Sequence, residues 1–278
     1  NTLRLWKATA TEEFKLDEFN AGAYAESVAA KNTAENISMV LYPNDANENG
    51  KALRLQQQYL LASASLQDIV ANWVGRHGDD FTHFAEKNCF QLNDTHPSVA
   101  VAELMRLLID NHRLEWADAW DIVQKTMAYT NHTLLPEALE RWSVGLFQSL
   151  LPRVMEIIFE INAHFLAEVS ARWPSDSERL ARMSLIEEGH GDKHVRMAYL
   201  AIVGSFSVNG VAELHSHLLK EGLFKDFYDL WPGKFNNKTN GVTPRRWLAA
   251  CNPDLADFIS ESIGDKWVTD LSELKKLE

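Results

Sequence analysis

Three short segments of this sequence place amide, hydroxyl, imidazole and carboxylate side chains directly after apolar runs. They are residues 93–96 (Asn-Asp-Thr-His), 130–133 (Thr-Asn-His-Thr) and 238–241 (Lys-Thr-Asn-Gly). Neutral donors and acceptors with few carboxylates suit a ligand that consists mainly of hydroxyl groups, and a sugar is such a ligand. One such segment alone is explained as a turn or a helix cap, where Asn, Asp and Thr are common. Three of them favour a polar binding pocket.

The elements predicted around these segments would bring them together. Residues 90–92 and 126–129 are predicted as short strands, and each precedes a polar turn and a stretch of helical periodicity. Strand, turn and helix in this order indicate an α/β fold. Because the ligand crevice of an open α/β sheet lies at the carboxyl ends of its strands, we expect the three segments to line one edge.

The rest of the chain is predicted to be mostly helical. Hydrophobic periodicity predicts long helices at 51–73 and 150–173. Residues 20–36 are compatible with a helix but carry few apolar side chains, which indicates either a surface helix or one completed by a partner subunit. A strand is predicted at 3–6 and a short strand or a turn at 207–210. Helices are predicted at 99–111, 117–125, 194–204, 211–219 and from about Pro136 onward.

Metal binding is one alternative for the polar residues. Asp94, His96 and His132 are ligand types, and His190 and His194 are four positions apart. Glycines at positions 189 and 191 disrupt a helical histidine pair, and no further ligands follow at a metal-binding spacing. We therefore predict no metal site.

A second alternative is an inverting glycosidase that uses Asp94 and Glu137 as its acid and base. Glu137 is explained more simply as a carboxylate in the first turn of a helix, where the helix dipole favours it. His215 and His217 flank Ser216 in a predicted helix and would point to different faces, so we interpret them as core or surface residues.

Composition narrows the function classes. The 278 residues are 46% hydrophobic and 24% charged, as in globular proteins. The formal charge of −12 disfavours binding to nucleic acids and anionic membranes. Two cysteines, Cys89 and Cys251, predict no disulfide framework and favour the reducing cytoplasm. The sequence carries neither of the common glycine-rich nucleotide motifs, and its most apolar stretch is too short to span a membrane.

Four strings in the sequence carry a specific resemblance to a known family. They are residues 91–97 (QLNDTHP), 128–133 (AYTNHT), 135–142 (LPEALERW) and 237–247 (NKTNGVTPRRW). These strings closely resemble the α-glucan phosphorylases, that is, the glycogen and maltodextrin phosphorylases, and the similarity covers essentially the whole chain. In that family the chain matches only the middle of a longer polypeptide.

The resemblance implies a fold and a domain layout. The expected fold is helix-rich α/β, part of the amino-terminal Rossmann-like domain of a two-domain (GT-B) glycosyltransferase. Residues 1–243 would form the latter part of that domain, with a tower-like helix at about 24–36 that makes a homodimer. Residues 244–278 would form a helical connection toward a carboxy-terminal domain that this chain does not contain.

The resemblance also implies an activity. The family carries out cytoplasmic phosphorolysis of terminal α-1,4-glucosidic bonds and releases α-glucose 1-phosphate with retained configuration. Its pyridoxal phosphate is a proton relay held on a lysine, which we expect outside this chain. The isolated chain is therefore predicted to be inactive, and a non-catalytic glucan-binding or regulatory module is the alternative.

Carried over residue by residue, the resemblance assigns roles to the polar segments. His132 is the expected catalytic residue, with its carbonyl near the developing oxocarbenium ion, and His132 and Asn240 would hold the 6-hydroxyl of the reacting glucosyl unit. Asp94 and His96 would line the pocket on the β face of the anomeric carbon.

A loop upstream is expected to gate that pocket. Asn44 and Asp45 resemble the start of the mobile gating loop of the family, whereas Ala46 and Asn47 depart from its animal pattern of Asn followed by Phe.

Overall fold

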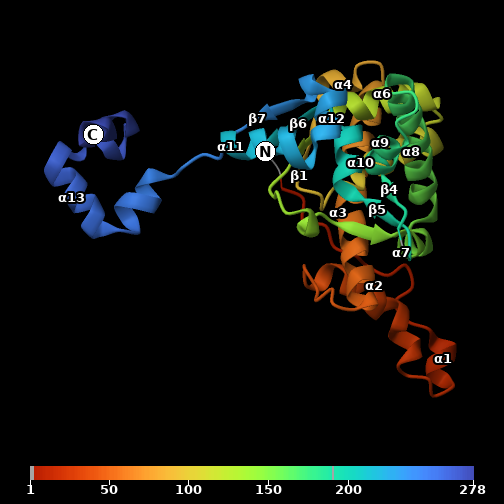
Figure 1. Ribbon diagram of the computed structural model, residues 1–278. Helices are drawn as coiled ribbons and strands as arrows, with labels where there is room; N and C mark the ends of the chain where they lie inside the picture. Colours follow the sequence, from red (N-terminus) through yellow and green to blue (C-terminus); the bar gives the residue numbers. More distant parts are fainter. Residues whose placement is uncertain (1–2, 190) are drawn as a thin grey trace. The chain divides into compact units, whose positions relative to one another are not determined.

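The computed structural model describes residues 3–189 and 191–278, which fall into two compact units, Asn1–Asn237 and Lys238–Glu278 (Figure 1). We describe each unit by itself. The boundary expected between residues 243 and 244 is a boundary between domains of a longer protein. It stays a prediction.

The first unit is built around a four-stranded parallel sheet in the order β1-β2-β6-β7. Its strands are β1 (Phe90–Asn93), β2 (Met127–Thr130), β6 (Ser207–Gly210) and β7 (Phe235–Asn237). Met127, Tyr129 and Val208 are fully buried, as expected for a parallel sheet covered on both faces. The strands predicted at 90–92, 126–129 and 207–210 are confirmed.

The longest helix, α3 (Glu48–His77), has clear physical boundaries at both ends. At its start, the Asn47 side chain accepts a hydrogen bond from Gly50 N at 2.9 Å, which is an N-cap contact. At its end, Gly78 adopts a φ of 67°. The helix therefore extends beyond the predicted range of 51–73.

Other helices surround the sheet and form the core. The buried helix α5 (Ala100–Arg106) packs against α3 and against the long helix α8 (Pro152–Arg172), while α10 (Met197–Gly204) packs against β2. Further helices of this unit are α4 (Phe84–Lys87), α6 (Trp116–Thr126), α7 (Val144–Leu150), α9 (Ser177–Met183), α11 (Glu213–Leu218) and α12 (Lys225–Leu230).

A small antiparallel sheet replaces helices that the sequence pattern favoured. It has the order β3-β5-β4, with β3 (Arg141–Ser143), β4 (Ile186–Glu187) and β5 (His194–Arg196). The helix expected from Pro136 is a single turn, Pro136–Ala138, and residues 194–196 form β5 before α10 begins. Strands this short carry no periodicity that distinguishes them from helix ends.

The amino-terminal segment also differs from expectation. Instead of one helix at 24–36, α1 (Leu16–Asn20) and a helical turn, Glu26–Val28, precede α2 (Ala29–Met39), which packs on α3. The predicted strand at 3–6 is wrong: these residues form neither a helix nor a strand, and Leu3 and Leu5 are 81% and 85% exposed.

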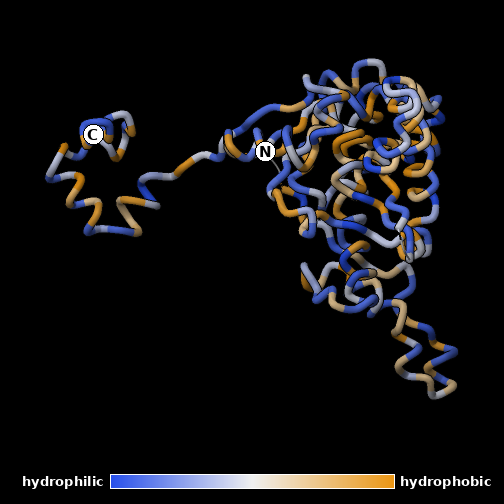
Figure 2. The backbone as a smooth tube through the Cα atoms, in the orientation of Figure 1, coloured by the Kyte–Doolittle hydropathy of each residue, from blue (hydrophilic) through white to orange (hydrophobic). Residues whose placement is uncertain are grey.

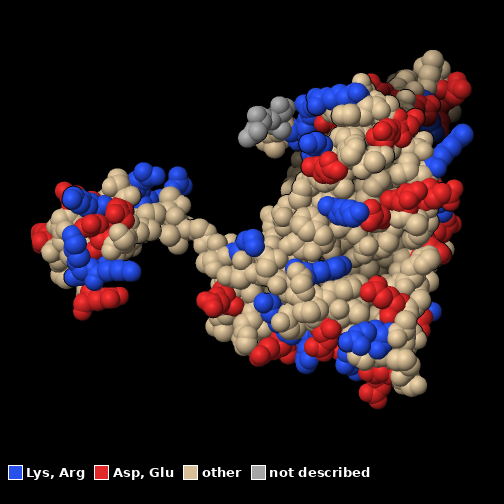
Figure 3. Space-filling model, turned by 90° about the horizontal axis from the view of Figure 1, so that it is seen from above, with Lys and Arg blue, Asp and Glu red and all other residues tan. Residues whose placement is uncertain are grey.

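Apolar and polar residues are mixed along the chain of the first unit, and charges of both signs are mixed over its surface. Hydrophobic and hydrophilic positions alternate along most segments of the first unit in Figure 2, and Figure 3 shows Lys and Arg beside Asp and Glu over its surface. Within the described ranges, no helix combines the length and the apolar character needed to cross a membrane.

The second unit is a small helical cluster. Its main helix is α13 (Pro253–Ile263), which begins after the capping residue Asn252. Short helical turns at Arg245–Ala250, Asp265–Val268 and Leu271–Leu277 complete it. Its core is small and centres on Trp267, which is fully buried against Ala256 and Ile259.

Candidate functional site

The candidate site lies where the parallel strands of the first unit end. Asn93 closes β1 and pairs with Thr130 of β2, which pairs in turn with Asn209 of β6. Gln91 Nε2 donates to Thr130 Oγ1 at 2.9 Å, and Thr130 Oγ1 donates to Asn209 Oδ1 at 2.8 Å. Two of the three predicted polar segments therefore meet at one edge of the sheet, which we call the rim.

Asp94 turns the chain at the end of β1. Its φ of 65° is left-handed, a conformation that Asp adopts more readily than most residues. Asp94 N donates to Thr130 O at 3.0 Å, and Asp94 Oδ1 accepts from Thr95 N at 2.7 Å. These bonds hold the Asp94 carboxylate at the rim beside β2.

His132 is an exposed residue of the turn after β2. Its Nε2 atom lies 2.6 Å from Asn93 Oδ1. Because an amide oxygen only accepts hydrogen bonds, this contact assigns the hydrogen to Nε2 and leaves Nδ1 of the neutral ring as an acceptor. A ligand hydroxyl can donate to that Nδ1 atom.

Asn131 is fully buried and fixes the same turn from inside. Its Nδ2 donates to Tyr129 Oη at 3.1 Å, and its Oδ1 accepts from Thr133 N at 3.1 Å. Its backbone N donates to Asn209 O at 2.9 Å. The backbone that carries His132 is therefore anchored to both β2 and β6.

His215 connects this turn to the segment after β6. Its Nδ1 accepts from Val211 N at 3.0 Å, so the hydrogen is on Nε2, which donates to Asn131 Oδ1 at 3.1 Å. Burial lowers the pKa of His215, the Thr133 backbone opposes part of this shift, and the neighbouring His132 adds to it. The sequence interpretation missed this role because Asn131 is 84 positions away.

Gly210 allows α11 to approach the end of β6. A Cβ atom at this position would lie 2.5 Å from Ser216 Oγ and 2.9 Å from Ser216 Cα, closer than real side chains come. With glycine in place, Ser216 Oγ reaches the end of β7 and donates to Asn237 Oδ1 at 2.8 Å. The close approach at Gly210 therefore ties a third pair of strand ends into the rim.

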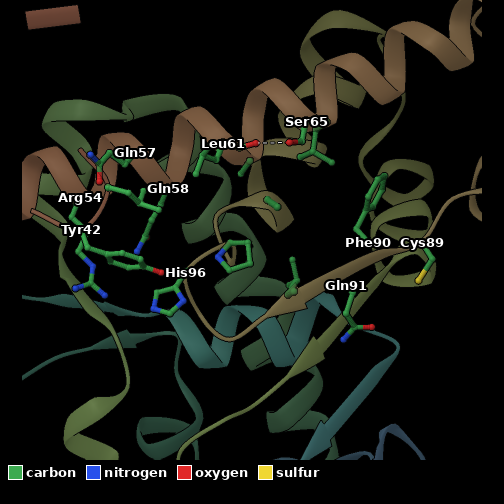
Figure 4. Close-up of a pocket in the computed structure, with 16 residues that line it drawn as sticks. Tyr42, Arg54, Gln57, Gln58, Leu61, Ser65, Cys89, Phe90, Gln91 and His96 are labelled. Atoms are coloured by element: carbon green, nitrogen blue, oxygen red, sulfur yellow. Dashed lines mark hydrogen bonds between the residues drawn. The ribbon is translucent and has the colours of Figure 1, made fainter. Parts of the chain in front are cut away.

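His96 faces the loop that precedes α3. The ring centroids of His96 and Tyr42 are 5.9 Å apart in an edge-on contact. Figure 4 shows both rings beside a cavity of about 480 Å³ lined by residues of α3 and β1. Its lining is mainly apolar, so the cavity itself does not have the polar character expected of a sugar site.

Asn44 and Asp45 lie in that loop and are held by local contacts. Asn44 Oδ1 accepts from Ala46 N at 2.9 Å, and Asp45 Oδ2 accepts from Arg54 Nη1 at 2.9 Å. Gly50 lets the loop lie directly on the first turn of α3, since a Cβ there would overlap the Asn44 carbonyl. The structure thus connects the predicted gating loop to α3 through Arg54, a residue that the motif analysis did not select.

Asn240, the remaining predicted site residue, belongs to the second unit and is exposed. Its proximity to His132 therefore stays a prediction.

Within residues 3–189 and 191–278, no group of three or more His, Cys, Asp or Glu side chains is arranged to hold a metal ion. His190, one half of the histidine pair considered above, lies outside the described residues.

Lys234 is a partly buried lysine whose surroundings can be compared with those that a pyridoxal phosphate lysine needs. Burial lowers its pKa to about 8, as a Schiff-base lysine requires. Its Nζ, however, lies 3.8 Å from the centroid of the Trp231 ring and donates to the carbonyls of Ile202 and Val203. Lys234 also precedes β7 and is thus at the opposite end of the sheet from the rim. Lys234 therefore does not fit the cofactor.

The parallel sheet and its polar rim define a helix-rich α/β protein with hydrogen-bonding side chains gathered at the strand ends. Comparison with known families then identifies the particular one. All 278 residues match the model of a family described as carbohydrate phosphorylase, and the chain belongs to that family, whose members have the GT-B glycosyltransferase fold.

Named relatives agree with this assignment. The chain is 55% identical to the muscle form of glycogen phosphorylase from Bos taurus and 54% identical to the human brain form, and covers 34% of each. It is 56% identical to a glycogen phosphorylase from Synechocystis, of which it covers 32%. All of this chain aligns in each case, so it spans about a third of the length of these relatives.

Proposed function

We propose that this chain is the central part of an α-glucan phosphorylase. The complete enzyme would use phosphate to cleave terminal α-1,4-glucosidic bonds and release α-glucose 1-phosphate with retained configuration. The observation that carries this proposal is the match of the whole chain to the carbohydrate phosphorylase family, with glycogen phosphorylases as relatives at 54–56% identity. The rim supports it, since it offers neutral hydrogen-bonding groups at the place where α/β sheets bind ligands.

His132 is the proposed catalytic residue at the reacting glucosyl unit. With Nε2 donating to Asn93, its Nδ1 accepts a hydrogen bond from the sugar 6-hydroxyl, and Asn240 is the proposed second contact of that hydroxyl. Its backbone carbonyl is the dipole proposed to face the positive charge that develops on the anomeric carbon. Anchoring by Asn131 keeps that carbonyl in place during the reaction.

Asp94 and His96 are the proposed lining of the pocket on the β face of the anomeric carbon. The left-handed turn at Asp94 holds its carboxylate at the rim, where it can accept hydrogen bonds from sugar hydroxyls. His96 faces the loop of Asn44 and Asp45, and this contact supports a gating role for the loop.

The phosphate chemistry is assigned to the rest of the protein. The family's pyridoxal phosphate is proposed to supply a proton relay, attached to a lysine outside this chain, because Lys234 faces away from the rim. The 278-residue chain alone is therefore proposed to orient a sugar without cleaving it.

The projection formed by α1, the turn 26–28 and α2 is the proposed homodimer contact. Phe14 and Phe19 have ring centroids 5.3 Å apart, and Phe19 and Tyr24 4.9 Å apart, yet these rings are 46%, 43% and 63% exposed. A second copy would cover them. The cytoplasm is the proposed compartment, which agrees with the free thiols of Cys89 and Cys251.

The full-length protein tests this function by its products from a maltooligosaccharide. We expect glucose 1-phosphate only when phosphate is present. Glucose released without phosphate would instead indicate the glycosidase that uses Asp94 and Glu137. Calorimetric binding of the oligosaccharide without either product would indicate a glucan-binding module.

A further inference from the structure

Glu140 connects the rim to α3. It lies between the helical turn Pro136–Ala138 and β3, and its side chain is 11% exposed. Its Oε1 accepts from Arg54 Nη2 at 2.9 Å and from Gln58 Nε2 at 2.8 Å, and its Oε2 accepts from Thr95 Oγ1 at 2.8 Å. One carboxylate thus receives three hydrogen bonds, two from α3 and one from the turn after β1.

Thr95 transmits this contact to both neighbouring site residues. It stands between Asp94 and His96 and is 1% exposed, so its side chain has little freedom of its own. The hydrogen bond from Thr95 to Glu140 therefore fixes the backbone from which the Asp94 carboxylate and the His96 ring project. A shift of that backbone would move both groups.

Arg54 extends the connection to the loop. Its Nη2 donates to Glu140 and its Nη1 to Asp45 Oδ2, both at 2.9 Å. The guanidinium carbon also lies 5.7 Å from the centroid of the Tyr42 ring, which touches His96. A planar guanidinium with donors in fixed directions holds two carboxylates in one geometry, which a lysine ammonium does not do.

We propose that Glu140 is a positioning residue that sets the placement of the Asp94–His96 turn and of the Asp45 loop together. The inference rests on the proposed function, because it concerns the geometry of the same sugar site. When the loop changes position, the ion pair between Arg54 and Asp45 changes, and the shared carboxylate of Glu140 passes that change to Thr95. Loop position and sugar-site geometry are thereby coupled.

Glu140→Gln in the full-length enzyme is the direct test. Gln is neutral and carries a donating NH2 group in place of one carboxylate oxygen. It therefore loses the ion pair with Arg54, and Thr95 Oγ1 can no longer donate to it while its single oxygen accepts from α3. A misplacement of site groups by about 1 Å can cost about a hundredfold in rate, so we expect kcat/KM for phosphorolysis to fall by about tenfold to a hundredfold. Glu156→Gln is the matched control, since Glu156 pairs with Arg153 on the exposed side of α8 and should leave kcat/KM unchanged.

A double-mutant cycle separates positioning from simple support of the fold. Combining Glu140→Gln with Asp45→Asn should give a kcat/KM that departs from the product of the two single effects by about threefold or more, because both carboxylates act on Arg54. When Glu156→Gln is combined with Asp45→Asn, the change in kcat/KM should equal the product of the two single effects. If Glu140→Gln does not fold, Thr95→Val replaces it in the double-mutant cycle with Asp45→Asn. This variant removes the hydrogen bond from Thr95 to Glu140 and keeps a side chain of similar volume.

Two outcomes would overturn the proposal while the enzyme itself remains active. One is an unchanged kcat/KM in folded Glu140→Gln or Thr95→Val, and the other is independence of these variants from Asp45→Asn. Failure of the proposed function gives a different result, namely a wild-type full-length protein that forms no glucose 1-phosphate.

Discussion

His215 shows how a residue outside the recognised motifs shapes the rim. It accepts from Val211 N and donates to Asn131 Oδ1, so both contacts need the neutral ring with its hydrogen on Nε2. Protonation would place a second donor against Val211 N and break that bond. The network that carries His132 is thus sensitive to the charge of His215.

This sensitivity predicts a pH dependence of stability. Because burial lowers the pKa of His215 in the folded chain, the unfolded chain takes up the proton first as the pH falls below about 6.5. The stabilisation by neutral His215 is thus complete above that pH and is lost progressively below it.

Urea unfolding of wild type and His215→Gln at pH 8 and pH 5.5 measures the effect. The difference in unfolding free energy between the two proteins should be smaller at pH 5.5. His217→Gln is the control, since His217 lies exposed beside Glu221. An equal difference at both pH values would exclude a neutral His215 in this role.

Asn240 provides a second prediction at this scale. In the full-length enzyme, Asn240→Ala would remove the proposed hydrogen bond to the sugar, and one such neutral bond is typically worth about 0.5–1.5 kcal/mol. We therefore expect kcat/KM to fall about twofold to tenfold without a change in thermal stability.

Asn72→Ala is the matched control, because Asn72 is exposed on α3 and donates to Asp68 O. Wild-type turnover in Asn240→Ala would remove Asn240 from the site.

At the scale of elements, the projection formed by α1, the turn 26–28 and α2 carries exposed aromatic rings close together. Replacing both Phe19 and Tyr24 by Ser should convert the proposed full-length dimer to monomer, since the contact would lose two exposed aromatic side chains. Sedimentation velocity measures the change. Phe159→Ser, at a 41% exposed position on α8, is the control and should leave the dimer intact. A dimer that persists in the double variant would place the interface elsewhere.

Elements with a strong local signal were predictable from the sequence. The strands at the rim are short apolar runs that end in turn residues, and α3 and α8 have long hydrophobic periodicity, so both kinds were found close to their true bounds. The strands β3, β4 and β5 were missed because two or three residues show no period, and their pairing partners are distant in sequence. At residues 3–6 the apolar pattern was misleading, since no strand pairs with it in the described chain.

The site was predictable only in part, because many of its contacts join residues that are distant in sequence. Asp94 and His132 stand in segments whose composition alone is unusual, and the structure brings these two segments together at the rim. Asn131, His215, Arg54 and Glu140 act through partners that are far apart in sequence, such as the 86 positions between Arg54 and Glu140. Only the folded chain shows these contacts.

For the whole molecule, we propose that the chain contributes a sugar-binding rim to an enzyme of the length of its relatives, of which it spans about a third. In the proposed function, the substrate phosphate and the cofactor phosphate would both be positioned against the glycosidic oxygen, and proximity of this kind supplies much of the rate of such reactions. The rim offers polar groups for a sugar, while Lys234 points away from it.

The ³¹P NMR spectrum of products tests this division most directly, with maltooligosaccharide and phosphate given to the full-length protein and, in parallel, to the 278-residue chain supplied with pyridoxal phosphate. The full-length protein should produce α-glucose 1-phosphate, and the chain alone should leave phosphate as the only signal besides the cofactor. Glucose 1-phosphate formed by the chain alone would mean that the phosphate machinery lies within these residues. No product from the full-length protein would contradict the assignment of the rim to a phosphorylase.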